Sequence, residues 1–526
     1  MPAPCALSLA LGLWGVRRQD SIWRDEVVTY DMAHRGLPEL WDTLQNADAV
    51  HGFYYLFMHA LFDVFGGGVL TLRLPSVLAM TAAAAGVALL GARVAGERAG
   101  LAAGLVFPLL PLVQQYAQEG RSYALVCALV TWSTYLLVRA LAASPATVDA
   151  PGPGLFGVPG PARRWWTAYV VVTLAACLLH EFAVLVLAAH GTTVVLADVP
   201  CAVRHAVRRT WLVAAGVVAA GLAPLALFSA GQSAQLSWAL WPDPVQLVTF
   251  GVLAVVGVTC ARVPVRARGP VRTCGPVWTR GPVRTCESVR AREPVRARGP
   301  VGLGPLAVPL LIAPPAALML LSQLQPMFVD RYVLYYVVGF ALLAGAALDR
   351  VFRPLGDHGD RAGRADRARR RRAVWALVAV LVALLPAAVY LRSPQSRTDD
   401  ATAVVRAVRA VAEPGDGLLF MPARRRVWTR SEPERFRDLT DLALSREPDS
   451  ARSLYGTEVP ADRIRARMLG SERIVVLSDP RDEPEDETSG EITKRTTLRD
   501  AFTPCRTQDV TGARITVYAR PGHCDD

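Results

Sequence analysis

Long apolar runs that recur along the whole chain of 526 residues constrain its fold more than any other feature. Most of them are close to the roughly 17–25 residues that an α-helix needs to cross a bilayer. Since a soluble protein does not repeat such runs so often, we predict a polytopic α-helical membrane protein with about eleven transmembrane helices. The runs are residues 3–16, 68–92, 100–117, 122–140, 165–179, 182–198, 211–229, 245–260, 301–321, 332–348 and 374–391.

The composition supports this prediction, because 52% of the residues are hydrophobic and only 19% are charged. An ordinary soluble enzyme of this length is less apolar. Residues 3–16 are short for a span, but no A-x-A-like cleavage site follows them, which argues against a signal peptide. We therefore interpret residues 3–16 as the first transmembrane helix.

The arginines predict the orientation, because positive residues near helix ends resist translocation. If the chain starts in the cytoplasm, the arginine-rich loops are all cytoplasmic, and the loops on the other side are poor in arginine. The cytoplasmic loops are then 93–99, 141–164, 199–210, 262–300 and 350–373. The net charge of +12 thus indicates topology and not a nucleic-acid partner. Asp25, Glu26 and the tail from residue 393 are expected outside the cytoplasm.

Residues 262–300 repeat with a period of six, with proline at 264, 270, 276, 282, 294 and 300. This density of proline and glycine opposes a helix, and the charge opposes a core. One interpretation is a tether for lipid headgroups or for a partner. We prefer a low-complexity insertion in a cytoplasmic loop of a transmembrane domain that covers residues 1–392.

The tail, residues 393–526, has the pattern of a small α/β domain. "TAVVRAVRAVAEPGDGLLFM" reads as helix, turn and strand, while "SERIVVLSDP" and "ARITVYAR" read as further strands. "PERFRDLTDLALS" is helical in pattern. Cys505 and Cys524 can pair if the tail is extracytoplasmic.

Polar residues gather at the predicted outer ends of the helices. Ionisable groups that border a hydrocarbon layer are costly and commonly mark a pathway or a site. The set is Asp25, Glu26, His51, Tyr54, Tyr55, His59, Gln118, Glu119, Arg121, Tyr123, His180, Glu181, Asp330, Arg331 and Tyr332. Each has a structural alternative: Asp25 and Glu26 would suit the first turn of a helix capped by Ser21, and Arg331 would suit an interfacial anchor.

Several of these residues occur in a recognisable order. Trp23, Asp25 and Glu26 form W-x-D-E, His51 precedes the pair Tyr54–Tyr55, and R-L-P-S stands at 73–76. Q-E-x-R-x-Y then covers 118–123, and Arg331–Tyr332 follows late in the chain. Over about residues 10–350 this pattern resembles the GT-C membrane glycosyltransferases, and within them family 39 and related mannosyl- and aminoarabinosyltransferase-like bacterial proteins. It departs from many relatives at Gly52–Phe53, where they have Pro-Pro, and at Asp330, where they have proline.

The resemblance implies an inverting transfer of a hexose, most commonly mannose, from a polyprenyl-phosphate sugar to an acceptor hydroxyl. The acceptor would be a glycan, lipid or protein outside the plasma membrane. The chemistry needs a base for the hydroxyl and cationic partners for the leaving phosphate. The expected catalytic residues are Asp25, as base, and Glu26. The expected donor-phosphate residues are Arg331, Arg121, His51 and His180. The expected acceptor or positioning residues are Gln118, Glu119, Tyr123, Tyr54 and Tyr55.

Two other functions fit parts of the pattern. A transporter or flippase of lipid-linked sugars would also need outer polar clusters, but it would more typically show internal repeats and mid-membrane charge. An inactive membrane scaffold would not need the combination of Asp25, Glu26, Gln118, Glu119 and Arg121. Two adjacent carboxylates are not a sufficient metal signature, so no metal site is predicted, although a divalent metal would be chemically compatible with them.

Overall fold

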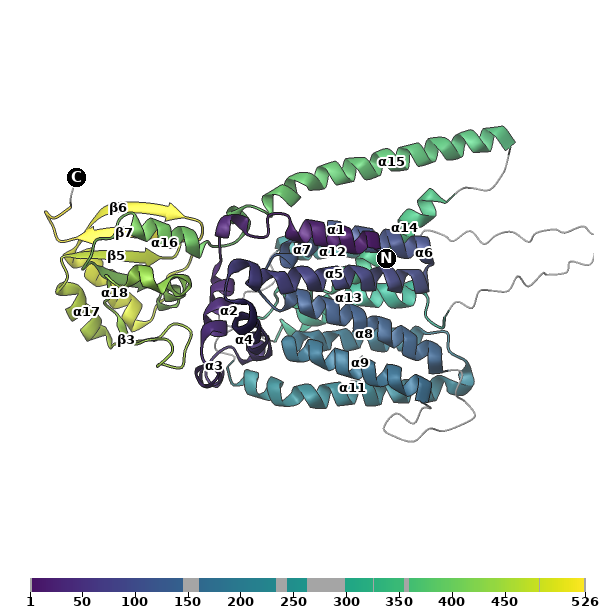
Figure 1. Ribbon diagram of the computed structural model, residues 1–526, viewed down its shortest axis with the longest axis horizontal. Coiled ribbons are helices and arrows are strands. Elements are labelled where there is room, and N and C mark those ends of the chain that lie inside the picture. The colour runs from purple at the N-terminus through teal and green to yellow at the C-terminus, as the bar shows by residue number, and fades with distance from the viewer. Residues whose placement is uncertain are drawn as a thin grey trace, which may run out of the picture.

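The computed structural model describes residues 2–144, 160–232, 244–262, 299–324, 326–353, 359–481 and 483–524. It consists of a helical bundle with an α/β domain at one end (Figure 1). The repeat at 262–300 lies almost wholly outside the described residues.

Every apolar run predicted from the sequence is helical in the bundle, which confirms the predicted fold class. The helices are α1 (Pro2–Leu13), α5 (Val69–Val94), α6 (Glu97–Val106), α7 (Pro111–Ala117), α8 (Tyr123–Ala143), α9 (Gly160–Leu179), α10 (Val186–Leu196), α11 (Cys201–Ala230), α12 (Pro244–Arg262), α13 (Leu303–Leu321), α14 (Tyr336–Phe352) and α15 (Gly359–Tyr390).

Helix length and composition give a smaller number of spans than the predicted eleven. Among the described residues, six helices are long and apolar enough to cross a membrane. A seventh span results if α6 and α7 are counted together across their bend of 64°. The bend follows from the extended backbone of Leu110 before Pro111, since a residue that precedes proline avoids the helical region. Most of the remaining apolar runs form shorter helices, and α9, with 20 residues, is long enough but is not among these six.

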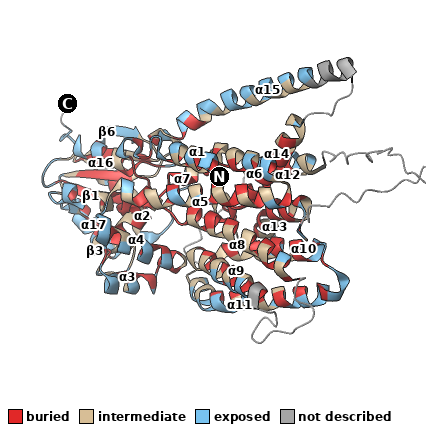
Figure 2. Ribbon diagram, turned by 45° about the vertical axis from the view of Figure 1, so that its right-hand side comes forward, coloured by how far each residue is buried: buried red, intermediate tan, exposed pale blue. Residues whose placement is uncertain are grey.

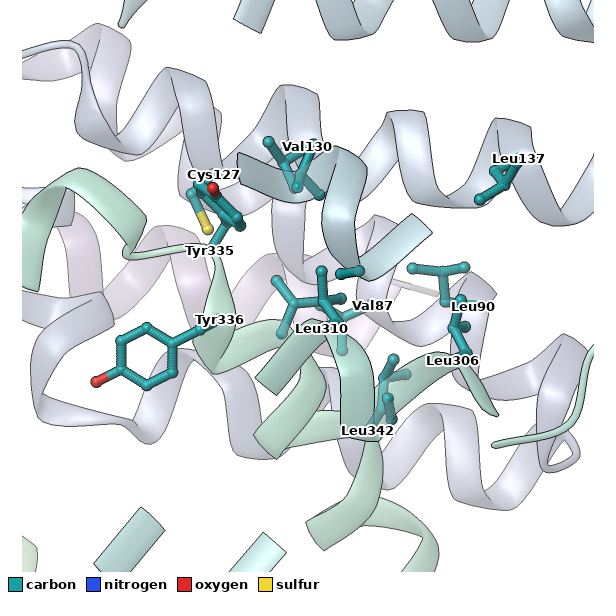
Figure 3. Close-up of a cluster of buried hydrophobic side chains, with 14 of the residues drawn as sticks. Val87, Leu90, Cys127, Val130, Leu137, Leu306, Leu310, Tyr335, Tyr336 and Leu342 are labelled. Atoms are coloured by element: carbon teal, nitrogen blue, oxygen red, sulfur yellow. The ribbon is translucent and has the colours of Figure 1, made fainter. Parts of the chain in front are cut away.

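The interior of the bundle is built from apolar faces of α5, α8, α13 and α14. Val87 and Leu90 of α5 lie near Leu306 and Leu310 of α13 (Figure 3). Small residues permit the closest approaches: a Cβ atom on Gly345 of α14 would lie 2.3 Å from the backbone nitrogen of Ala103 in α6. Such contacts between small residues are typical of helices that pack within a membrane. By contrast, α15 leans away from the bundle and is exposed along most of its length (Figure 2).

Three short helices follow α1 and precede α5 in the chain. They lie at the end of the bundle that carries the α/β domain (Figure 1). They are α2 (Arg24–His34), α3 (Leu37–Leu44) and α4 (Gly52–Phe65). The ends of α8 and α14 that lead into the arginine-rich loops lie at the opposite end, and α15 runs from there back to the α/β domain.

The C-terminal domain contains a five-stranded sheet in the order β2-β1-β5-β7-β6. Its strands are β1 (Gly417–Met421), β2 (Thr440–Asp441), β5 (Arg473–Ser478), β6 (Thr503–Val510) and β7 (Ala513–Ala519). β1 is parallel to β2 and β5, whereas β7 is antiparallel to β5 and β6. A two-stranded sheet pairs β3 (Leu444–Arg446) with β4 (Thr457–Glu458). The predicted strands at "GLLFM", "RIVVLS" and "ARITVYA" are therefore confirmed.

The five-stranded sheet is covered on both faces, because successive side chains of a strand point to opposite sides. Leu418 and Phe420 of β1 belong to the core beneath α16 (Ala401–Arg409). Leu419 belongs to the other core, beneath α17 (Ala461–Leu469) and α18 (Ser489–Ala501). The core beneath α16 continues into α2 and α4, so the two domains share apolar packing.

The helix expected at "PERFRDLTDLALS" is wrong. After a short 3-10 turn at Pro433–Phe436, the chain forms the edge strand β2. The backbone N–H of Leu442 donates to the carbonyl of Leu418 at 3.0 Å. The Asp441 carboxylate also accepts hydrogen bonds from the N–H groups of Ala443 and Leu444. Pairing with β1 and this local turn therefore replace the helix.

Candidate functional site

Asp25 lies in the first turn of α2, after the extended residue Trp23. Its carboxylate is 3.4 Å from the Arg331 guanidinium and 3.7 Å from that of Arg24. Burial by itself would raise the pKa of Asp25, but the charges of Arg121 and Arg331 outweigh it and hold the pKa below its usual range. Asp25 is therefore ionised at neutral pH.

Arg331 belongs to the 3-10 turn Asp330–Val333 before α14, 306 residues from Asp25. Its Nε donates to the Tyr123 hydroxyl at 3.2 Å, and its guanidinium lies over the rings of Trp23 and Tyr123. The side chain is 19% exposed. Arg331 is thus held by aromatic faces, and a small part of its side chain is exposed.

Arg121 is the centre of a second, more enclosed network. Its guanidinium donates to the Tyr55 hydroxyl at 3.1 Å and to His51 Nε2 at 3.0 Å. His51 Nδ1 lies 2.7 Å from Asp48, whose carboxylate also accepts from Tyr55. We assign the proton of His51 to Nδ1, because Nε2 faces a donor. Burial and the charge of Arg121 lower the pKa of His51, so the ring is neutral.

This geometry changes the role expected for His51. Both of its ring nitrogens have partners within the protein, so it orients Arg121 and has no free N–H for a phosphate. Asp48 was not among the predicted site residues. Its position three residues before His51 is the one local signal in the sequence that points to it.

His180 closes the site from the side of α9. Its ring centroid lies 4.5 Å from that of Tyr332, 5.6 Å from Tyr123 and 5.6 Å from His51. Burial lowers the pKa of His180 well below its usual value, and its Nδ1 has no hydrogen-bond partner among the described residues. The Tyr54 ring lies 6.5 Å from that of Tyr55, and its buried hydroxyl has no partner in the described part of the chain either.

Glu26 has a structural role that its place beside Asp25 does not reveal. It is fully buried and forms two hydrogen bonds with Arg73, at 2.7 and 2.6 Å. It also accepts from the backbone N–H of Gly120 at 2.9 Å. Glu26 thus fixes the start of α5 and the turn before α8 against α2 through Arg73 and Gly120.

Gln118 also turns away from the site. Its side-chain amide donates to the carbonyls of Gly12, in the last turn of α1, and Trp14, just after it. The next residue, Glu119, is 2% exposed, and within the described ranges its Oε2 has no hydrogen-bond partner. Burial raises the pKa of Glu119 to about 7, although Arg397 and Arg331 oppose the rise. His59 and Glu181 lie apart, bonded to the Ala33 carbonyl and to Ser229.

An apolar groove of about 610 Å³ adjoins the site. It lies between the start of α7, α12, α13 and the start of α14, and its walls include Phe250, Phe328, Val337 and Phe340. Asp330, next to Arg331, lines it as well. Arg331 is therefore the direct sequence neighbour of a residue in the wall of this apolar groove. Among the described residues, no group of three or more His, Cys, Asp or Glu side chains is placed to hold a metal ion.

No protein-family model and no curated protein matches this sequence. Solved structures do match its fold. The crystal structure of ArnT from Cupriavidus metallidurans bound to undecaprenyl phosphate aligns with a TM-score of 0.51 and 12% identity, over 98% of this chain and 97% of that one. The apo form of ArnT gives 0.52 and 11% over the same shares. This chain therefore has the GT-C fold that its sequence resembles.

Proposed function

We propose that this protein is a membrane glycosyltransferase that moves a hexose from a polyprenyl-phosphate sugar to an acceptor hydroxyl outside the plasma membrane. Mannose is the sugar that the family resemblance favours. The observation that carries the proposal is the ion pair Asp25–Arg331 next to the apolar groove, whose wall includes the neighbouring residue Asp330. The fold shared with ArnT, crystallised with undecaprenyl phosphate, supports the same donor class.

The groove supports a lipid-linked donor by its chemistry. An isoprenoid chain is purely apolar, and burying it among side chains such as Phe250 and Phe340 removes it from water. Its phosphate would then lie near Arg331, where a partly exposed guanidinium offers forked N–H donors. Arg121 is less available, since Tyr55 and His51 occupy its terminal nitrogens. Arg331 is therefore the primary phosphate partner, and Arg121 acts mainly through its charge.

The reaction is a single displacement. As the acceptor oxygen forms its bond to the anomeric carbon, Asp25 takes the hydroxyl proton. The bond from that carbon to the phosphate oxygen breaks, and Arg331 stabilises the negative charge that develops on the leaving phosphate. Attack from the face opposite the phosphate inverts the anomeric carbon. Because the charges of Arg121 and Arg331 keep the pKa of Asp25 low, the base is ready without a preceding deprotonation.

The active site and the C-terminal domain are proposed to be extracytoplasmic. The disulfide between Cys505 and Cys524 supports this side, since disulfides persist in oxidising compartments. The arginine-rich helix ends at the other end of the bundle support it independently.

Asp25→Asn tests the proposed base. The variant should insert and fold normally, yet transfer at least about 100-fold more slowly, because asparagine cannot accept the proton. The assay measures the loss of labelled mannose from undecaprenyl-phosphate mannose in proteoliposomes supplied with membranes of the source cell as acceptor. Asp20→Asn, an exposed residue of the same loop, is the matched control. Normal turnover by Asp25→Asn would exclude this mechanism.

A further inference from the structure

Helix α2, which carries Asp25, has no cap from its own sequence. The residue before its first turn is Trp23, and no side chain of that residue accepts a hydrogen bond there. The first N–H groups of a helix need such an acceptor. Here the Oδ1 atom of Asp399 accepts from the Arg24 N–H at 2.7 Å, across 375 residues of sequence. We propose that Asp399 is a positioning residue of the C-terminal domain that caps α2 and sets the place of the Asp25 carboxylate.

Asp399 is itself fixed by its own domain. It is 3% exposed, and its Oδ2 lies 3.9 Å from the Arg425 guanidinium, which is buried and paired with Asp479. Gly512 packs against it so closely that a Cβ atom there would lie 2.4 Å from the Asp399 Cβ. The carboxylate thus has little freedom to move when it meets α2.

The backbone on both sides of this contact is also joined. The N–H of Ala401 donates to the carbonyl of Ile22 at 2.9 Å. The Thr402 hydroxyl accepts from the Ile22 N–H and donates to the Asp20 carbonyl. A continuous set of hydrogen bonds therefore joins residues 20–24 to residues 399–402. Of these bonds, the one between Asp399 and the Arg24 N–H is nearest to Asp25 in the sequence.

The far part of α2 is held by the same domain. Arg430 donates to Asp31 at 2.8 Å, and Arg35 donates to the Ser453 carbonyl at 3.2 Å. These contacts fix where the helix lies, but they leave its first turn free to fray. The cap at Arg24 is what orders the turn that holds Asp25, and a carboxylate there also complements the helix dipole.

The inference rests on the proposed role of Asp25, and its test separates the two. Asp399→Ala removes the acceptor, whereas Asp399→Asn keeps an oxygen that caps about as well. Asp400→Ala is the matched control, because the neighbouring Asp400 carboxylate caps α16 through the Ala403 N–H at 3.0 Å, whereas the Arg24 N–H of α2 is bonded to Asp399. Both alanine variants lose one helix cap from the same stretch of chain.

Two readouts are measured on the full-length protein in proteoliposomes. Hydrogen–deuterium exchange reports on the amides of residues 23–28, and steady-state transfer from undecaprenyl-phosphate mannose gives kcat and KM. We expect Asp399→Ala to increase exchange in this segment and to lower kcat about tenfold with little change in the donor KM, since small misplacements of a reacting group are costly. Asp399→Asn should restore both values, and Asp400→Ala should change neither.

Unchanged exchange at residues 23–28 in Asp399→Ala would overturn the inference whatever the activity. Increased exchange with normal kcat would overturn it too, because the cap would then not matter for the reaction. If kcat falls equally in Asp400→Ala, the fall in Asp399→Ala reflects general destabilisation of the domain. The positioning role of Asp399 is then rejected. If the wild-type protein shows no transfer at all, the proposed function fails, and the exchange data alone still decide whether Asp399 caps α2.

Discussion

The adjacent carboxylates of Asp25 and Glu26 have different roles in this protein. Asp25 stays at the open edge of the site beside Arg331, while Glu26 is enclosed with Arg73 and Gly120. The helical turn of about 100° between neighbouring residues separates them, because it sends their side chains to different faces. Glu26, whose carboxylate is hydrogen-bonded inside the protein, holds neighbouring elements together. Asp25, whose contact with Arg331 is long and partly exposed, stays available for a substrate.

Glu119 is the carboxylate whose titration should be measurable. Burial raises its pKa from 4.5 to about 7, so the folded state retains a proton that the unfolded state loses first. Stability from this group is therefore present below about pH 4.5 and is lost as the pH rises to about 7, by on the order of 3 kcal/mol. Glu119→Gln should remove this loss.

The measurement is the apparent melting temperature of both proteins in detergent between pH 4.5 and 8. The variant should gain a few degrees over the wild type as the pH rises. A difference between the two proteins that stays constant over this range would show that Glu119 does not titrate there.

At the scale of elements, the groove between α7, α12, α13 and α14 gives the second prediction. Thr249 of α12 is exposed on its wall, and Thr249→Trp should fill part of the volume that an isoprenoid chain needs. We expect the KM for undecaprenyl-phosphate mannose to rise about fivefold or more, with a smaller change in kcat. Val255→Trp, on an exposed part of the same helix outside the groove, is the control. Equal kinetics in both variants would place the lipid elsewhere.

The sequence predicts elements well where the signal is local. Apolar runs correctly locate every helix of the bundle, and alternating residues locate β1, β5 and β7. It fails at residues 433–445, because the hydrogen bond between Leu442 and Leu418 decides the structure of that segment, and the pattern of the segment does not reveal this partner.

The sequence likewise predicts some residues of the site and not others. The residue types and spacing point to Asp25, Arg121 and Arg331, which the structure brings together. They do not show that Gln118 faces α1, and they give no sign of Asp399, whose partner is 375 residues away. Contacts of that kind depend on how the domains pack, which no local pattern encodes.

At the scale of the whole molecule, the two ends of the bundle should face different compartments. Single cysteines are placed at position 290, in the repeat, and at position 440, on exposed β2, in a background without the free cysteines. A membrane-impermeant maleimide should label position 440 in intact cells and position 290 after permeabilisation only, because the arginine-rich loops stay in the cytoplasm. Labelling of position 290 but not 440 in intact cells would reverse the orientation.

The 375 residues between Arg24 and Asp399 also separate the time at which α2 is synthesised from the time at which its cap is synthesised. A ribosome adds roughly 5–20 residues per second, so about 20–75 s pass between the synthesis of α2 and that of its cap. On the inference drawn above, a nascent chain already holds Asp25 in the membrane but cannot order the turn around it until the domain that carries Asp399 has been made and exported. Synthesis of that domain would then act as the switch that makes the enzyme competent, and a chain truncated before residue 399 would remain in the membrane as an inactive product.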